Sequence, residues 1–82
     1  MNITIYSTSI CASCNSLGDW LHKNGFEFTK KITDTDDEVM AEFMSINDGM
    51  IGVPFTVITD EENREIKISG FDIKAFKKAL NI

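Results

Sequence analysis

Two segments in the first third of the chain alternate between apolar and polar residues, the pattern of a β-strand with one buried face. They cover residues 2–7 and 26–32. Between them, residues 12–24 carry apolar side chains at helical spacing, and Gly25 supplies a stop because glycine tolerates the left-handed conformation that ends helices. Two strands joined by a helix run parallel, so this third of the chain predicts a β-α-β unit with a right-handed crossover.

The middle of the chain predicts a second helix. Thr35 followed three residues later by Glu38 is a capping-box signature, which marks a helix start. Asn47-Asp48-Gly49 marks the end of this helix. Its apolar residues form a stripe that we expect to face the core: Val39, Met40, Phe43 and Met44.

The last third predicts a β-hairpin followed by a helix. Residues 53–59 and 65–69 are typical of strands, and the acidic turn between them is short enough for antiparallel pairing. Asp72 is the expected N-cap of the last helix. The apolar stripe of that helix consists of Ile73, Phe76 and Leu80. Together the elements predict a small mixed α/β domain, with one sheet and helices on both of its faces.

Composition limits the class of protein. The chain has 82 residues, of which 43% are hydrophobic and 26% charged, an ordinary balance for one globular domain covering residues 1–82. Its net charge of −5 argues against a nucleic-acid partner, because phosphate binding needs a basic face. No apolar run is long enough to cross a bilayer, and no secretory signal pattern is visible. We therefore expect a cytoplasmic monomer without a membrane partner.

A C-x-x-C motif, Cys11-Ala12-Ser13-Cys14, stands at the junction of the first strand and the first helix. Residues three apart in the first helical turn share one face, close enough to join in a disulfide. Cys11 lies at the helix start, where free backbone N–H groups and the helix dipole stabilise a thiolate, the form that attacks disulfides. Cys14 should be more covered and act as the resolving thiol. The motif in this context is typical of dithiol redox proteins.

A metal site is the alternative interpretation, because C-x-x-C is half of many zinc sites. The chain offers no third cysteine, and its single histidine, His22, lies about two helical turns past Cys14 and out of coordination reach. A metal or iron–sulfur cluster shared between two chains stays open. A purely structural disulfide is disfavoured, because so small a loop restricts the unfolded chain little.

Pro54 is the only proline, and it stands where the third strand begins. Proline cannot donate to a strand ladder, which places it at a strand start or at a sheet edge. The residues leave both a trans and a cis bond open at this position. A backbone held open beside Cys11 could accept an extended peptide as an added strand.

Taken in order, these features give the chain a family likeness. It resembles the glutaredoxins, and most closely the NrdH-type redoxins, which supply electrons to ribonucleotide reductase. The segments that carry the likeness are Ile3-Thr4-Ile5-Tyr6, the C-x-x-C, Gly25-Phe26-Glu27-Phe28, Val53-Pro54 and Ser69-Gly70-Phe71-Asp72. The resemblance implies a thioredoxin fold with three helices, a four-stranded sheet in the order 2-1-3-4 and a cis Pro54. It implies Cys11 as the nucleophile and a substrate groove formed by Ala12, Ser13, Val53, Pro54, Gly70, Phe71 and Asp72.

The same resemblance implies a dithiol–disulfide oxidoreductase without a bound cofactor, which reduces a disulfide-containing protein such as ribonucleotide reductase. Either glutathione or thioredoxin reductase would be the reductant. Glutathione-dependent members usually carry Pro-Tyr between the cysteines and a basic residue two positions before the first cysteine, whereas this chain has Ala12-Ser13 and Ser9. These departures favour thioredoxin reductase. Asp72, in contrast, resembles the residue that meets the glutathione amine, so both reductants stay open.

Overall fold

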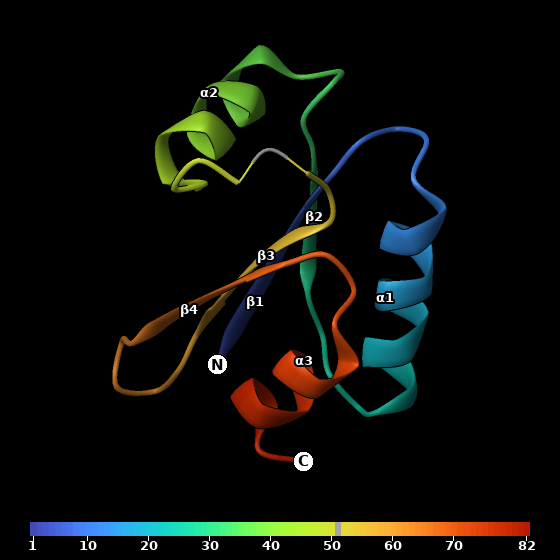
Figure 1. Cartoon of the computed structure of the whole chain (residues 1–82), viewed down its shortest axis with the longest axis vertical. Coiled ribbons are helices and arrows are strands. Elements are labelled where there is room, and N and C mark those ends of the chain that lie inside the picture. The colour runs from blue at the N-terminus through green and yellow to red at the C-terminus, as the bar shows by residue number, and fades with distance from the viewer. Residues whose placement is uncertain (51) are drawn as a thin grey trace.

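A mixed β-sheet with the strand order β2-β1-β3-β4 forms the centre of the computed structural model, which describes residues 1–50 and 52–82 (Figure 1). The strands are β1 (Asn2–Ser7), β2 (Thr29–Ile32), β3 (Phe55–Thr59) and β4 (Glu65–Ser69). β1 pairs with β2 in parallel, and the pairs β1–β3 and β3–β4 are antiparallel. The predicted sheet order and hairpin are therefore confirmed.

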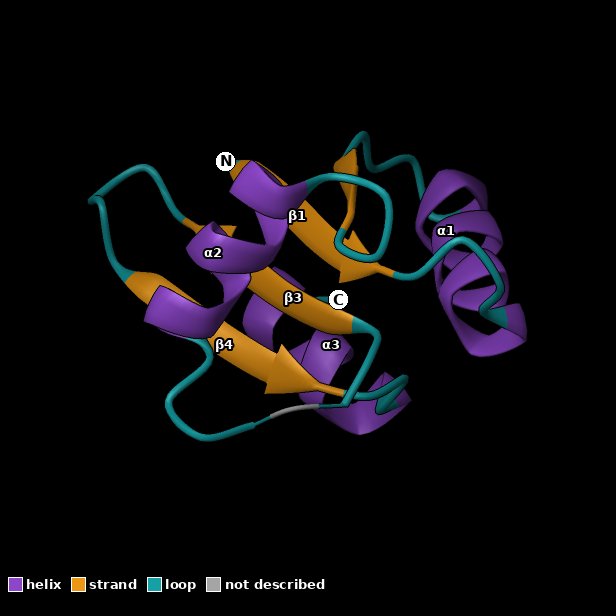
Figure 2. Ribbon diagram, turned by 90° about the horizontal axis from the view of Figure 1, so that it is seen from above, coloured by secondary structure: helices purple, strands orange, loops and turns teal. Residues whose placement is uncertain are grey.

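Helices cover both faces of this sheet (Figure 2). α1 (Ala12–Lys23) and α3 (Ile73–Leu80) lie on one face, and α2 (Asp37–Ile46) lies on the other. The core is correspondingly divided. The buried residues on the α1 and α3 side are Ile3, Ile5, Leu17, Leu21, Ile58, Ile68, Phe76 and Leu80. A smaller aromatic cluster under α2 consists of Tyr6, Phe43 and Phe55. In the described residues, we find no helix with the length and apolarity needed to cross a membrane.

β2 is shorter than its alternating pattern predicts, since it begins at Thr29 and not at residue 26. The backbone N–H of Phe26 donates to the carbonyl of Leu21 at the end of α1, at 2.9 Å, and so does not join the sheet. Phe26 and Phe28 still pack against the core from the connection between α1 and β2. Their alternation thus reflects packing against the core outside the strand ladder.

The start and the buried face of α2 differ from the prediction. The N-cap is Asp36, not Thr35, and the Asp36 carboxylate accepts hydrogen bonds from the backbone N–H groups of Glu38 and Val39. Met40 and Met44 are exposed, so the predicted stripe is wrong for both methionines. The residues that face the core are instead Val39, Phe43 and Ile46. A single helix lying on one sheet face buries one line of side chains, and the methionines stand about 100° further round the helix.

α3 begins as predicted, with the Asp72 carboxylate accepting from the N–H of Ala75 at 3.2 Å. Phe76 and Leu80 are buried, but Ile73 is 43% exposed, so the predicted stripe is wrong at its first position. Ala75 and Ala79 complete the contact with the core instead. The helix therefore packs on the sheet along its length from Ala75 onward, and only its first turn projects into solvent.

The correction at the start of α2 can be tested by mutation. Asp36→Ala is expected to lower the free energy of unfolding by about 1 kcal/mol, because two backbone N–H groups lose their acceptor. Thr35→Ala is the matched control and is expected to change it by less than about 0.5 kcal/mol. Urea denaturation of both variants measures the difference. A larger loss for Thr35→Ala than for Asp36→Ala would mean that Thr35 is the N-cap, as the capping-box signature predicts.

Candidate active site

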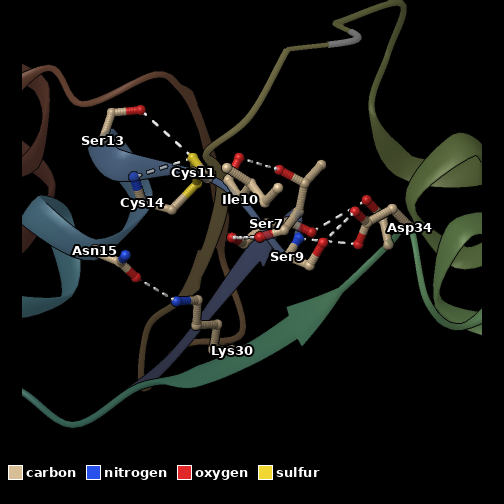
Figure 3. Close-up of a disulfide and its surroundings, with 11 residues drawn as sticks. Ser7, Ser9, Ile10, Cys11, Ser13, Cys14, Asn15, Lys30 and Asp34 are labelled. Atoms are coloured by element: carbon tan, nitrogen blue, oxygen red, sulfur yellow. Dashed lines mark hydrogen bonds between the residues drawn. A yellow bond between two sulfur atoms is a disulfide. The ribbon is translucent and has the colours of Figure 1, made fainter.

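The two cysteines lie at the N-terminus of α1 and are joined in a disulfide (Figure 3). Their Cα atoms are 5.3 Å apart. Cys11 is the N-cap residue, with an extended backbone, and Cys14 lies in the first turn. Cys14 is 1% exposed and Cys11 is only half-buried, the difference that the spacing predicts. Cys11 is therefore the more accessible of the two cysteines.

Hydrogen-bond donors surround the sulfur of Cys11. The backbone N–H of Cys14 donates to the Cys11 Sγ at 3.2 Å, and the Ser13 Oγ lies 3.6 Å from the same sulfur. The first turn of α1 holds no acidic residue that would oppose a negative charge there. Once the disulfide is reduced, the same donors and the positive end of the helix dipole stabilise a Cys11 thiolate.

The connection that leads into Cys11 is tied to the segment that follows β2. The backbone N–H and the Oγ1 of Thr33 both donate to the carbonyl of Ser7, at 2.8 and 3.1 Å. One residue further on, the Asp34 carboxylate accepts from the N–H of Ser9 at 2.9 Å and from its Oγ at 2.7 Å (Figure 3). The Ser9 hydroxyl, aided by its N–H, lowers the pKa of Asp34 below its ordinary value.

Sequence reasoning missed this contact between Ser9 and Asp34, although a signal for it exists. In the parallel β1–β2 pair, Ser7 is the partner of Ile32. The same offset, continued past the strand ends, sets Ser9 opposite Asp34. Had the register been known, the contact could have been inferred.

Three connections leave the sheet at the end of the strands where the two cysteines lie. Tyr6 at the end of β1 is paired with Phe55 at the start of β3, which is in turn paired with Ser69 at the end of β4. The connection to Cys11, the turn before β3 and the turn after β4 are therefore neighbours. This row of paired residues explains how separate stretches of sequence meet at one site.

The turn before β3 contains a cis peptide bond between Val53 and Pro54, as the resemblance implies. The N–H of Gly70 donates to the carbonyl of Pro54 at 2.8 Å and fastens the two turns together. The Pro54 side chain is fully buried, whereas Val53 is half-buried. Any contact that Pro54 makes with a ligand would therefore have to come through the backbone around it.

Phe71 and Asp72 already have partners within the protein. The ring of Phe71 packs edge-on against Trp20, with the ring centroids 6.2 Å apart, and is only partly buried. One carboxylate oxygen of Asp72 caps α3. Both residues follow Gly70 directly, so they stand beside the two joined turns.

A cavity of about 210 Å³ lies on the Cys14 side of the disulfide, between α1 and β2. The Lys30 ammonium donates to the side-chain oxygen of Asn15 at 2.9 Å on its wall (Figure 3). Its lining residues are Cys14, Asn15, Gly18, Asp19, His22, Phe28 and Lys30. Over residues 1–50 and 52–82, no three or more His, Cys, Asp or Glu side chains gather in a way that could hold a metal ion. The alternative metal site would need ligands from another molecule.

Three solved structures that resemble this chain each align with 99% of it. The glutaredoxin of Methanosarcina mazei Go1 aligns with a TM-score of 0.79 at 22% identity, over 79% of its own length. A mutant of a thioredoxin-like protein aligns with a TM-score of 0.79 at 20% identity, over 96% of its length. The glutaredoxin of Archaeoglobus fulgidus aligns with a TM-score of 0.77 at 18% identity, over 87% of its length. The chain has the thioredoxin fold. By sequence, no family model and no curated protein matches it.

In this thioredoxin fold the turn at Gly70 depends on a backbone conformation that side chains disfavour. Gly70 has a φ of +80°, in the left-handed region. Gly70→Ala is expected to lower the free energy of unfolding by about 1–2 kcal/mol, because a Cβ opposes that conformation. Gly70→Asn is the matched control and is expected to cost less, since asparagine tolerates the left-handed region. Thermal and urea denaturation measure both, and equal losses would contradict the backbone explanation.

Proposed function

We propose that this chain is a glutaredoxin-like dithiol–disulfide oxidoreductase that reduces protein disulfides. The observation that carries the proposal is the Cys11–Cys14 disulfide at the N-terminus of α1, with one sulfur accessible and the other covered. In this proposal Cys11 and Cys14 are the catalytic residues. The neighbouring connections supply a substrate groove made of Ala12, Ser13, Val53, Pro54, Gly70, Phe71 and Asp72.

The reaction begins with the reduced chain. The Cys11 thiolate attacks one sulfur of the substrate disulfide, forms a mixed disulfide and releases the other substrate sulfur as a thiolate. Cys14 then loses its proton, and its thiolate attacks the Cys11 sulfur. This second attack forms the Cys11–Cys14 disulfide and releases the remaining substrate thiolate. The chain loses two electrons and the Cys14 proton, the substrate gains the two electrons, and its two thiolates take up that proton and a second one from solvent.

The unequal exposure of the two cysteines supports these separate roles, with Cys11 as the attacking thiol and Cys14 as the resolving thiol. The covered Cys14 sulfur can reach Cys11 within the same helical turn, whereas an external disulfide cannot easily reach it. The N–H of Cys14 points at the Cys11 sulfur, so it favours the charged form of the attacking thiol. Cleavage therefore starts at Cys11 and ends with the disulfide present in this structure.

The cycle needs an external reductant and no resident cofactor. Glutathione and thioredoxin reductase are the two candidates, and the disulfide of ribonucleotide reductase is a candidate substrate. A reducing compartment such as the cytoplasm suits a dithiol that must be regenerated after each turnover.

A direct test follows from the electron balance. The reduced protein, freed of reductant, is mixed with one equivalent of a protein disulfide such as that of insulin. The expected result is the loss of two thiols from the chain, seen as a two-hydrogen decrease in its intact mass, with one substrate disulfide reduced. Retention of both thiols would overturn the proposal. Turnover with glutathione and glutathione reductase, compared with thioredoxin reductase, then identifies the reductant.

A further inference from the structure

The connection of residues 8–10 between β1 and Cys11 presents two features to solvent. Ile10, which directly precedes Cys11, is 92% exposed. Its carbonyl accepts from the Thr8 hydroxyl at 3.1 Å, which helps to fix the turn. Beside it stands the exposed Asp34 carboxylate, held by both the N–H and the Oγ of Ser9. An apolar side chain and an anion are thus held next to the accessible cysteine.

The Asp34 carboxylate lies close enough to act on a molecule bound at Cys11. Consecutive Cα atoms are 3.8 Å apart, so the Cα atoms of Ser9 and Cys11 are at most about 7.6 Å apart. Since the carboxylate is hydrogen-bonded to Ser9, its charge lies on the order of 10 Å from the Cys11 sulfur. This distance is about one Debye length in 0.1 M salt. An incoming group at Cys11 therefore lies within the field of Asp34.

This negative charge is not neutralised by its hydrogen-bond partners. Both bonds to Asp34 come from the neutral groups of Ser9, and they hold the carboxylate in its ionised form. The two lysines of β2 have other partners: Lys31 pairs with Glu42 at 2.9 Å, and Lys30 binds Asn15 on the Cys14 side. Figure 3 shows Asp34 and Lys30 on different sides of the disulfide. The Cys11 side is thus the acidic one.

We propose that Asp34, together with Ile10, determines substrate specificity by selecting disulfides flanked by basic and apolar side chains over small anionic disulfides such as oxidised glutathione. This inference rests on the proposed oxidoreductase function and assigns its substrate class. Asp34 raises the local concentration of cationic groups at Cys11 and lowers that of anionic ones. Ile10 offers an apolar contact to the residue beside the substrate cysteine. A polypeptide disulfide with a neighbouring lysine or arginine meets both requirements.

The test uses three small disulfides that differ in charge: dicationic cystamine, neutral hydroxyethyl disulfide and dianionic dithiodipropionate. The second-order rate constant for oxidation of the reduced protein is measured for each, at low and at high salt. Asp34→Asn removes the charge but keeps the shape, because the amide oxygen can accept from the Ser9 N–H and the amide group can donate to the Ser9 Oγ. Glu61→Gln, in the β3–β4 turn at the other end of the sheet, is the control for net charge.

The wild-type protein is expected to react faster with cystamine than with dithiodipropionate. Asp34→Asn should reduce the ratio of these two rate constants about fourfold, since one unit charge at roughly 10 Å in water changes a rate about twofold and the charged group on the attacked sulfur changes from +1 to −1. High salt should shrink the difference. Glu61→Gln should leave the ratio unchanged.

Three outcomes separate this inference from the function on which it rests. An unchanged ratio in Asp34→Asn would overturn the inference while the function stands. Equal slowing with all three disulfides would also overturn it, since Asp34 would then only hold the turn. A wild-type protein that reduces none of them, and leaves a protein disulfide intact as well, fails the proposed function itself. Ile10→Ser completes the test, because it should slow an apolar peptide disulfide at least twofold more than cystamine.

Discussion

Cys11→Ser is expected to abolish disulfide reduction, with a loss of at least about 10³-fold in turnover, because the serine hydroxyl is not ionised near neutral pH. The remaining thiol, Cys14, is buried and cannot take over the first attack. Turnover with a protein disulfide and an excess of reductant measures the effect. A turnover close to that of the wild type would refute the assignment of Cys11 as the nucleophile.

Cys14→Ser is the matched partner of that variant. It keeps the accessible thiol and removes only the resolving one, so the first attack should proceed and the mixed disulfide should accumulate. Intact-mass measurement is expected to show the chain with one half of the substrate attached, in a form that a reductant releases. If the two variants behave alike, the two sulfurs do not have the separate roles proposed here.

Phe76→Ala is expected to have the largest effect on stability, with a loss of about 3–5 kcal/mol in the free energy of unfolding. The Phe76 ring is fully buried and packs edge-on against Trp20, with the ring centroids 6.1 Å apart. Its removal leaves a cavity between α3 and the sheet. In a domain of this size such a loss is a large share of the total stability, which chemical denaturation would reveal.

Two companion variants keep the stability experiment interpretable. Ile73→Ala changes the same helix at an exposed position and is expected to cost less than about 1 kcal/mol. Phe76→Leu keeps most of the buried volume and should remain folded at denaturant concentrations that unfold Phe76→Ala. A loss for Ile73→Ala that equals the loss for Phe76→Ala would mean that the stripe inferred from the sequence describes the buried face better than the structure does.

The sequence predicts those parts of the fold that are determined by neighbouring residues. The alternation of β1, the glycine after α1 and the cap at Asp72 are each encoded within a few positions, and the structure confirms them. The buried face of α2 is different. Helical spacing places Met40 and Met44 beside Phe43, but only the sheet determines which side of that line is covered. Tertiary contacts therefore decide what periodicity leaves open.

The same distinction holds at the candidate site. The C-x-x-C pair is local, so its position and its unequal exposure follow from helix geometry. The bond between Gly70 and Pro54 and the bonds between Ser9 and Asp34 join residues that are far apart in the chain. They arise from the registers of the β3–β4 and β1–β2 pairs, and a strand register cannot be predicted from a short sequence motif.

The direction of the β3–β4 hairpin has a practical consequence. Phe55 and Ser69 end the hairpin beside the dithiol, so the turn between Thr59 and Glu65 lies at the opposite end of the sheet. Asp60 closes that turn by accepting from the N–H groups of Glu62 and Arg64. A single cysteine introduced at exposed Glu61 would give an anchor for attaching the protein to an electrode, with the Cys11–Cys14 disulfide facing the solution.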